Sequence, residues 1–201
     1  MNRQIDEFRI VSGAMVTLAV AVAVLVAVPY VLLRGVQAPT ALKPYTPQQL
    51  RGRSVYVANG CVYCHSQQPR DPNQAPDAMR GWGRPSVAAD YAYDQPHLLG
   101  TMRTGPDLLN IGARQSSADW HLGHLYQPRA YTPGSTMPAL PFLFIERRGG
   151  TVAGEKAVAL PPPHAKPGVT VVASQDALDL VAYLLSLDRT YPVLPKSGAA
   201  R

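Results

Sequence analysis

The chain has 201 residues, of which 16% are charged, and it contains 20 prolines and 16 glycines. Its length predicts one domain with additional segments, and its many prolines and glycines predict a loop-rich fold. The formal net charge is +6, but no basic run interleaved with aromatic residues occurs, which argues against nucleic-acid binding.

An uncharged stretch covers residues 10–33, between Arg9 and Arg34. A helix that crosses a bilayer needs about 20 apolar residues, so this stretch is long enough to span with some tilt. A cleaved signal peptide is the alternative, but its apolar region would be only about 7–15 residues long. We therefore predict an uncleaved anchor at 10–33, preceded by a short terminus at 1–9. Pro29 can kink the helix.

After the anchor, residues 34–46 are predicted to form an extended linker because prolines punctuate them. Thr46 is a suitable cap for a helix over 47–58, and a proline follows it at the first helical position. In that helix Gly52 would allow another helix to approach closely. Gly60 is predicted to end the helix.

The segment Cys61-Val62-Tyr63-Cys64-His65 has the C-x-x-C-H spacing of a c-type haem attachment site. Two thiols on one helical turn can each add to a different vinyl group of the same haem, and the following histidine can ligate the iron. A thioredoxin-like redox pair would need a βαβ context, and a zinc site would need two further ligands at short spacing. We predict one covalent haem c.

Residues 66–100 are rich in proline and are predicted to be irregular, with a short helix near 87–93. They either form a surface loop or lie on a cofactor or partner. A haem-ligating histidine needs an acceptor for its other ring nitrogen. Pro106, in a Gly-Pro turn with fixed backbone, is predicted to supply this carbonyl to His65, unless it is an ordinary turn proline. Arg103 is a candidate for a haem propionate, unless it is a solvated surface arginine.

Ser117 is predicted to cap a helix over 118–127 that carries His121 and His124 on one face. Two histidines alone are a weak metal signal, so we interpret them as ordinary residues of the helix face.

The sixth iron ligand is predicted to come from a distant loop that crosses the other haem face. A His/Met pair raises the reduction potential, as in electron-transferring cytochromes c. Met137 lies in a proline-flanked loop after a helix, far enough from His65 for the chain to pass around the haem. We predict Met137 as the ligand, with Met79, Met102 or a histidine as alternatives.

Residues 146–173 are predicted to form an irregular, proline-rich insert. An apolar stripe predicts a last helix over 174–187, packed on the first helix with Gly52 close to Tyr183 or Leu184. The tail at 192–201 is predicted to be irregular. The expected fold is therefore all-α: one transmembrane helix, then a compact domain at 47–191 with long proline-rich loops.

These features together resemble a class I cytochrome c domain. Longer segments resemble the monohaem subunit II of C-family (cbb3-type) haem–copper cytochrome c oxidases. They read Y-V-A-N-G-C-V-Y-C-H-S-Q, S-V-A-A-D-Y-A-Y-D-Q-P, R-T-G-P-D-L, D-W-H-L-G-H-L-Y-Q-P-R and M-P-A-L-P.

The resemblance implies a subunit that passes electrons through haem c to a haem–copper catalytic subunit, where oxygen is reduced to water. Its partners would be that subunit, other oxidase subunits in the membrane, and a soluble or membrane cytochrome c as donor. The chain itself contains no catalytic constellation. Alternatives are the cytochrome c subunit of a nitric oxide reductase, a free membrane-tethered carrier, and a ligand-sensing haem domain.

The charges that flank the anchor leave its orientation open. Because haem is attached covalently outside the cytoplasm, we expect residues 35–201 on the periplasmic side of a bacterial inner membrane, with the amino terminus in the cytoplasm.

Overall fold

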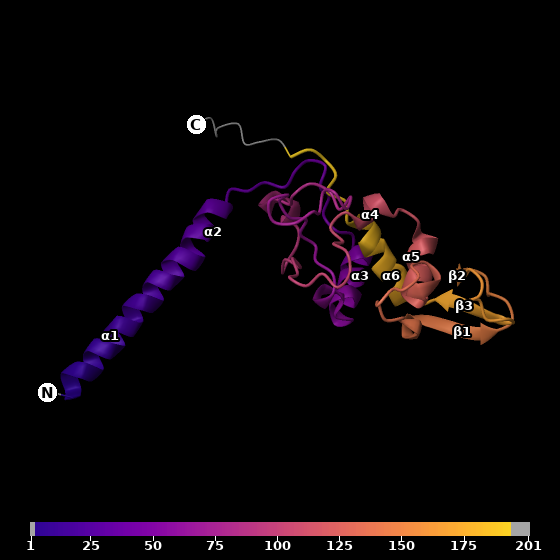
Figure 1. Cartoon of the computed structure of the whole chain (residues 1–201), viewed down its shortest axis with the longest axis horizontal. Coiled ribbons are helices and arrows are strands. Elements are labelled where there is room, and N and C mark those ends of the chain that lie inside the picture. The colour runs from indigo at the N-terminus through magenta and orange to yellow at the C-terminus, as the bar shows by residue number, and fades with distance from the viewer. Residues whose placement is uncertain (1–2, 194–201) are drawn as a thin grey trace. The chain divides into compact units, whose positions relative to one another are not determined.

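The computed structural model describes residues 3–193. Its internal contacts divide the chain into two units, Met1–Ala38 and Pro39–Arg201, which are described separately. The first unit contains one continuous helix over residues 3–33, labelled in Figure 1 by its two α-helical parts. Its segments are α1 (Arg3–Val22), the π-helical turn η1 (Ala23–Ala27) and α2 (Val28–Leu33).

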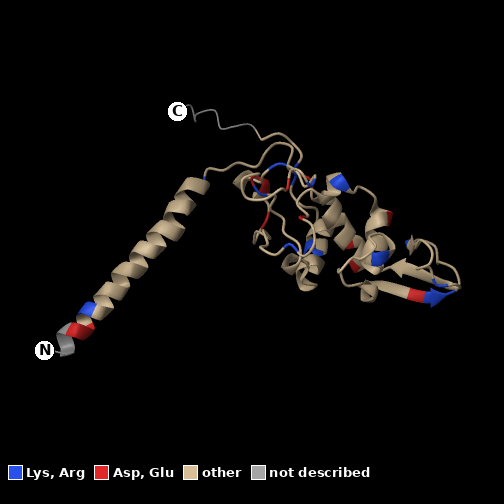
Figure 2. Cartoon of the chain, in the orientation of Figure 1, with Lys and Arg blue, Asp and Glu red and all other residues tan. Residues whose placement is uncertain are grey.

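Among the described residues, one helix is long and apolar enough to cross a membrane, and it covers Asp6–Leu33 with a hydropathy of 2.7. Its charged side chains lie near the amino-terminal end, and the rest of its length carries none (Figure 2). The wide turn η1 lies just before Pro29. A proline cannot donate the usual hydrogen bond to the carbonyl four residues earlier, and a π-turn is one way for the helix to continue past it.

Helices α3 (Pro47–Ala58) and α6 (Gln175–Ser186) form the framework of the second unit. Thr46 and Gln49 form a capping box at the start of α3, each side chain bonding the other residue's backbone N–H. Ser174 caps α6 by accepting a hydrogen bond with its side chain. Both helices predicted from the sequence are confirmed, and their ends follow the predicted caps.

The two helices touch at the level of the backbone. A Cβ atom on Gly52 would lie 1.8 Å from the carbonyl oxygen of Asp179, so a side chain at residue 52 would force the helices apart. The sequence predicted that Gly52 would meet Tyr183 or Leu184, but the contact falls one turn earlier. Tyr183 instead packs edge-on against Tyr56, with ring centroids 5.6 Å apart.

Shorter helices complete the helical part of this unit, and most of the chain between them is irregular. They are η2 (Cys61–Tyr63), η3 (Ala88–Tyr91), α4 (Ile111–Arg114), α5 (Ala118–Tyr126), η4 (Pro128–Ala130) and η5 (Pro141–Leu143). The helix predicted after Ser117 is confirmed as α5. The Ser117 hydroxyl accepts from the backbone N–H of Trp120 at 3.2 Å.

A small three-stranded sheet follows α5, in the order β1-β3-β2. Its strands are β1 (Phe144–Arg148), β2 (Ala157–Val158) and β3 (Val169–Ala173). Strand β3 is antiparallel to both neighbours, and its pairing with β1 runs from Phe144 opposite Ala173 to Arg148 opposite Val169. In Figure 1 the sheet forms one end of this unit, beside α5 and α6.

The all-α prediction is therefore wrong over residues 146–173, which were expected to be irregular. The run Val169-Thr170-Val171-Val172 is β-branched and suits a strand with one buried face. Val171 and Ala173 join the hydrophobic core. This short strand was not predicted because the proline-rich composition of the whole segment is typical of a loop.

The packed domain begins earlier than predicted. Leu42, in the expected linker, is buried, and Tyr45 packs against Tyr183 with ring centroids 5.7 Å apart. The loop at 66–100 is irregular, as predicted, but it is bonded to the domain. For example, the Tyr91 hydroxyl donates to the Gln67 carbonyl at 2.8 Å. Of the predicted tail, residues 194–201 lie outside the described residues.

Candidate haem site

The C-x-x-C-H segment begins where α3 ends. Gly60 has a left-handed backbone (φ +68°), which turns the chain into the short helix η2. The His65 backbone N–H donates to the Cys61 carbonyl at 2.9 Å, so the whole segment forms one compact turn. Both thiols are free, and Cys64 is exposed. One turn therefore presents Cys61, Cys64 and His65 together.

The electrostatics of Cys61 do not resemble those of a redox-active thiol pair. Burial raises the pKa of its thiol to about 11. Redox-active C-x-x-C pairs work through a thiolate, whose pKa is lowered by nearby positive charge or a helix amino terminus. A neutral, half-buried thiol at the first cysteine argues against the thioredoxin-like alternative.

The His65 ring is held by the turn that contains Pro106. The His65 Nδ1 atom lies 2.8 Å from the Pro106 carbonyl oxygen, the contact expected from the sequence. Gly105 lies against the ring, and a Cβ atom there would be 2.2 Å from Cε1 of His65. Burial lowers the pKa of His65, although the bond to Pro106 opposes this, and the neutral form is the one that binds metals.

Asp107, directly after that proline, ties the turn to the chain beyond His65. Its side chain is fully buried and accepts hydrogen bonds from the Ser66 hydroxyl and the Gln68 backbone N–H, both at 2.6 Å. It also accepts from the Leu109 backbone N–H at 2.9 Å. Asp107 was not among the residues predicted for the site. The only local signal was its place in the Gly-Pro-Asp-Leu run.

Arg103 is part of the same polar network. Its guanidinium donates to the Asp77 carboxylate at 2.6 Å, the Gln68 carbonyl at 2.7 Å and the Ser66 hydroxyl at 3.0 Å. The side chain is mostly buried and also lies over the ring of Trp82. Its contact with a haem propionate stays a prediction, and such a contact would have to use the donors left over.

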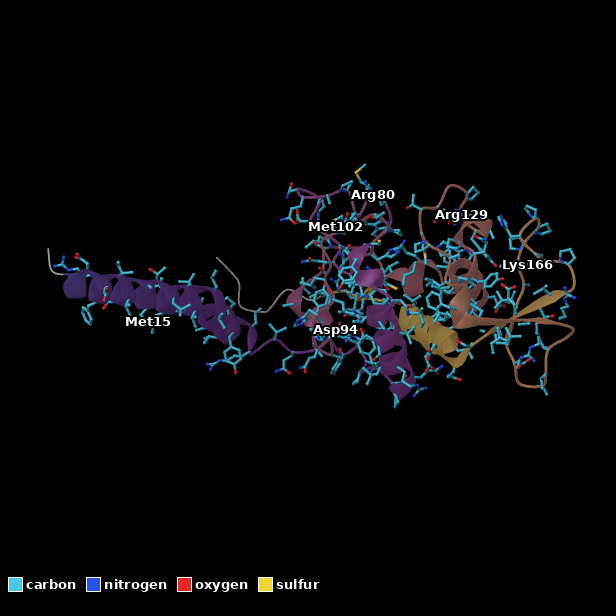
Figure 3. The ribbon with its side chains drawn as sticks, turned by 90° about the horizontal axis from the view of Figure 1, so that it is seen from below. Met15, Arg80, Asp94, Met102, Arg129 and Lys166 are labelled. Atoms are coloured by element: carbon cyan, nitrogen blue, oxygen red, sulfur yellow. The ribbon has the colours of Figure 1, made fainter. Side chains whose placement is uncertain are left out.

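Three methionines outside the anchor were candidates for the sixth ligand, and their surroundings differ. Met137 is half-buried and packs against the hydrophobic core that Cys61 also contacts. Met79 is 90% exposed, and Met102 is 58% exposed at the edge of the irregular loop (Figure 3). The surroundings favour Met137, and its role as a ligand stays a prediction.

The loop that carries Met137 folds back over α5. The Leu140 backbone N–H donates to the Leu125 carbonyl at 3.0 Å. Nearer its start, the Tyr131 ring lies against the helix at Gly123, where a Cβ atom would be 1.9 Å from the Tyr131 hydroxyl. The two contacts hold residues 128–140 along one side of the helix.

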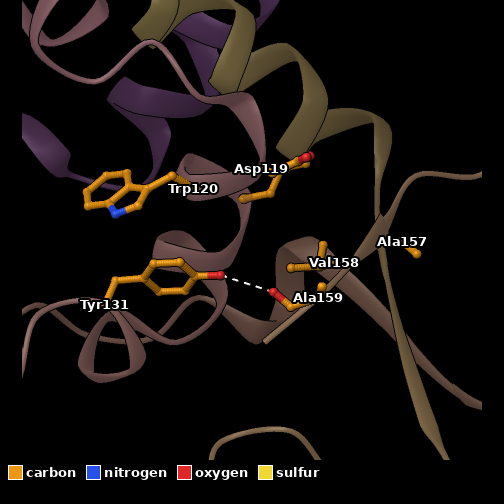
Figure 4. Close-up of a pocket in the computed structure, with 7 residues that line it drawn as sticks. Asp119, Trp120, Tyr131, Ala157, Val158 and Ala159 are labelled. Carbon is orange, nitrogen blue, oxygen red and sulfur yellow. Dashed lines mark hydrogen bonds between the residues drawn. The ribbon is translucent and has the colours of Figure 1, made fainter. Parts of the chain in front are cut away.

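The described residues also line two cavities. One, of 240 Å³, lies between α5 and β2 beside Trp120 and Tyr131, and the Tyr131 hydroxyl donates to the Ala159 carbonyl at 3.1 Å (Figure 4). The other, of 440 Å³, is lined by residues 41–45, Gln49, Ser186 and residues 188–191. None of the predicted haem-binding residues lines either of these two cavities.

The donor set suits a covalently bound haem. Two free thiols and a neutral imidazole are presented on one turn, and a half-buried thioether lies on a loop that returns to the core. A thioether and an imidazole are the ligands of electron-transferring cytochromes c.

The family described as "Cytochrome C oxidase, mono-heme subunit/FixO" matches residues 2–161 of this chain. The chain belongs to this family. The matched span contains the apolar helix, the C-x-x-C-H turn, Pro106 and Met137. The resemblance to the monohaem subunit of cbb3-type oxidases is thereby confirmed. A search of curated proteins gave no match.

Membership identifies the chain as the monohaem subunit of a cytochrome c oxidase complex, which implies one haem. The apolar helix Asp6–Leu33 is consistent with membrane anchoring.

Proposed function

We propose that this subunit transfers electrons through one covalently attached haem c to the haem–copper catalytic subunit of a cbb3-type oxidase. Cys61 and Cys64 form thioethers, each S–H adding across one vinyl group. His65 and Met137 would hold the haem iron. The electron donor is a soluble or membrane cytochrome c.

The observation that carries this proposal is the 2.8 Å contact between His65 Nδ1 and the Pro106 carbonyl. A backbone carbonyl in this position fixes the tautomer, because Nδ1 keeps its proton and Nε2 is left with a lone pair for a metal. Gly105 has no side chain that would clash with the ring, and Asp107 holds the turn in place through its hydrogen bond from Ser66. Together they set the orientation of His65 before any haem is bound.

When bound, the haem iron supplies a one-electron redox couple, and the protein supplies its ligands and its surroundings. If His65 and Met137 both hold the iron, they would leave no open site for a substrate. This supports electron transfer, and it disfavours a ligand-sensing haem domain.

The topology follows from the same chemistry. Haem is attached outside the cytoplasm, so Pro39 and the domain after it would lie in the periplasm, with the amino terminus in the cytoplasm. One apolar helix of membrane-spanning length occurs among residues 3–193, which supports a one-pass arrangement in the inner membrane.

The decisive experiment is to tag the chain, extract it in mild detergent, and measure its intact mass, haem types, copper and co-purifying subunits. We expect one added haem mass, together with haem b, copper and a large polytopic subunit. Non-haem iron without copper would indicate a nitric oxide reductase. An unmodified mass would refute covalent attachment, and haem c alone would indicate a free carrier.

The axial ligand is tested by Met137→Ala, with Met79→Ala and Met102→Ala as matched controls. We expect Met137→Ala to lower the midpoint potential and abolish the weak red absorption band of Met-ligated ferric haem, since only this variant removes a ligand. Both controls should retain the band. The assignment is wrong if Met137→Ala retains it too.

A further inference from the structure

The loop that carries Met137, residues 128–140, is attached to the three-stranded sheet at both of its ends. Near its start, the Tyr131 hydroxyl donates to the Ala159 carbonyl at 3.1 Å, directly after β2 (Figure 4). At its end, the chain passes through the short helix η5 and enters β1 without a break. The same sheet therefore holds the loop at two points.

The two attachments are joined to each other inside the sheet. Strand β3 lies between β1 and β2, and its Val172 pairs with Ile145 of β1 on one side and with Ala157 of β2 on the other. The Leu143 carbonyl, at the end of η5, also accepts from the Ser174 backbone N–H at 3.1 Å, just after β3. Backbone hydrogen bonds thus connect the start of the loop to its end.

Within the loop, a series of hydrogen bonds leads from Tyr131 to Met137. The backbone N–H groups of Tyr131 and Thr132 donate to the Pro128 carbonyl at 3.1 and 2.9 Å. The Ser135 backbone N–H donates to the Thr132 carbonyl at 3.1 Å, and the Met137 backbone N–H donates to the Ser135 hydroxyl at 3.2 Å. These consecutive turns tie the backbone position of Met137 to that of Tyr131.

The Tyr131 side chain is held against α5 on one side. Its ring lies edge-on to Trp120, with centroids 5.9 Å apart, and its hydroxyl lies so close to Gly123 that a Cβ atom there would be 1.9 Å away. The cavity of 240 Å³ between α5 and β2 lies beside the ring. The hydrogen bond to Ala159, rather than close packing, therefore links the ring to the sheet.

We propose that the sheet braces the loop that carries Met137, and that Tyr131 is the positioning residue through which it acts. This inference rests on the proposed ligation of the haem iron by Met137. The loop has to move when its thioether gives way to another ligand, and the bond from Tyr131 to Ala159 opposes that movement. The brace thus favours ligation by Met137 over ligation by a competing small molecule.

The test uses the full-length holoprotein in detergent and compares Tyr131→Phe with Tyr126→Phe. Phenylalanine at residue 131 keeps the ring on α5 but removes the bond to Ala159. Tyr126 is the matched control, because its hydroxyl also bonds the sheet, at Glu146 of β1, but comes from α5 and not from the loop. The probe is imidazole, which competes with methionine for ferric haem, and its binding is followed by loss of the weak red band.

We expect imidazole to bind Tyr131→Phe about 2- to 10-fold more tightly than wild type, the equivalent of one intramolecular hydrogen bond. Tyr126→Phe should bind imidazole as wild type does, whatever its Tm. A merely structural role for Tyr131 would lower Tm without changing the imidazole affinity. Equal affinities for Tyr131→Phe and wild type, or equal changes in both variants, would overturn the inference.

Failure of this inference can be distinguished from failure of the proposed ligand. If Met137→Ala keeps the red band, Met137 is not the ligand, and the inference is overturned together with that part of the proposed function. If the band depends on Met137 but Tyr131→Phe leaves the imidazole affinity unchanged, the inference alone is wrong.

A second measurement needs no variant, should Tyr131→Phe not fold. Coupling between two sites is reciprocal, so imidazole bound to the wild-type holoprotein should loosen the sheet contact as well as the loop. Hydrogen–deuterium exchange followed by mass spectrometry should become faster in residues 156–160 and in residues 131–137, and should stay unchanged in α3. Faster exchange confined to the loop would overturn the proposal.

Discussion

Helices α3 and α6 meet at Gly52 with no side chain between them, whereas the surface of the sheet is held by exposed ion pairs. The first contact includes the buried Asp179 carboxylate, which accepts from Arg51 at 2.6 Å. On the sheet, Lys166 bonds Glu146 at 2.8 Å, but both side chains remain substantially exposed.

The difference shows where the domain can tolerate change. The helix crossing positions the end of α3, and with it the turn that starts at Cys61. Its contacts are between backbone and buried groups, which cannot relax without moving the helices. The exposed pairs of the sheet are screened by solvent and contribute little. Substitutions should therefore separate the two regions clearly.

The largest loss of folding stability is expected from Gly52→Ala. The new Cβ would lie 1.8 Å from the Asp179 carbonyl, so the helices must separate, at a cost of about 3 kcal/mol or more. Thermal unfolding of the holoprotein should show a large fall in Tm or loss of the folded domain. Gly150→Ala, beside β1 with nothing within 4 Å of its Cβ, is the control. Equal Tm values for the two variants would contradict the close crossing.

A smaller loss of folding stability is expected from Tyr183→Phe. The Tyr183 hydroxyl and the Gln67 side-chain amide bond each other at 3.1–3.2 Å, and both residues are buried. Removing the hydroxyl takes one hydrogen-bond partner from a buried amide, which costs about 1–3 kcal/mol. Denaturant titration should show this decrease in the free energy of unfolding. The control Tyr93→Phe, at a more exposed tyrosine, should leave the free energy of unfolding unchanged. Unfolding free energies equal to wild type would mean that the amide finds another partner.

The ion pair at the crossing predicts a pH dependence. The hydrogen bond from Arg51 holds the pKa of Asp179 below its ordinary value, so the stabilisation is present above that value. It is lost as the pH falls and the carboxylate is protonated. The Tm advantage of wild type over Asp179→Asn should be largest near neutral pH and decline progressively as the pH falls below about 4. An advantage that persists in acid would show that charge is not the cause.

The smallest effect on folding stability is expected from Lys166→Ala. Its bonds to Glu146 are solvent-exposed, so side-chain entropy and screening offset their energy. We expect no resolved change in Tm at moderate salt. A loss of stability comparable to that of Tyr183→Phe would contradict the expectation that the ion pairs on the sheet contribute less than the contacts at the helix crossing.

Several parts of the fold follow from signals within a few residues of sequence. Thr46, Ser117 and Ser174 begin helices because each side chain caps the backbone N–H groups that follow it. The apolar anchor and the C-x-x-C-H spacing are equally local. The contact of Pro106 with His65 could be predicted because a metal-binding histidine requires an acceptor and a proline fixes one.

What only the tertiary structure decided lies between distant residues. Ser66 and Asp107 are 41 positions apart, and Gln67 and Tyr183 are 116 apart, so neither pairing leaves a local pattern. Strand β3 gains its stability from β1 and the core, which its own short sequence does not reveal. The bond that Tyr131 makes beside β2 is likewise visible only when its neighbours are in place, because hydrogen-bond satisfaction is a property of the packed chain.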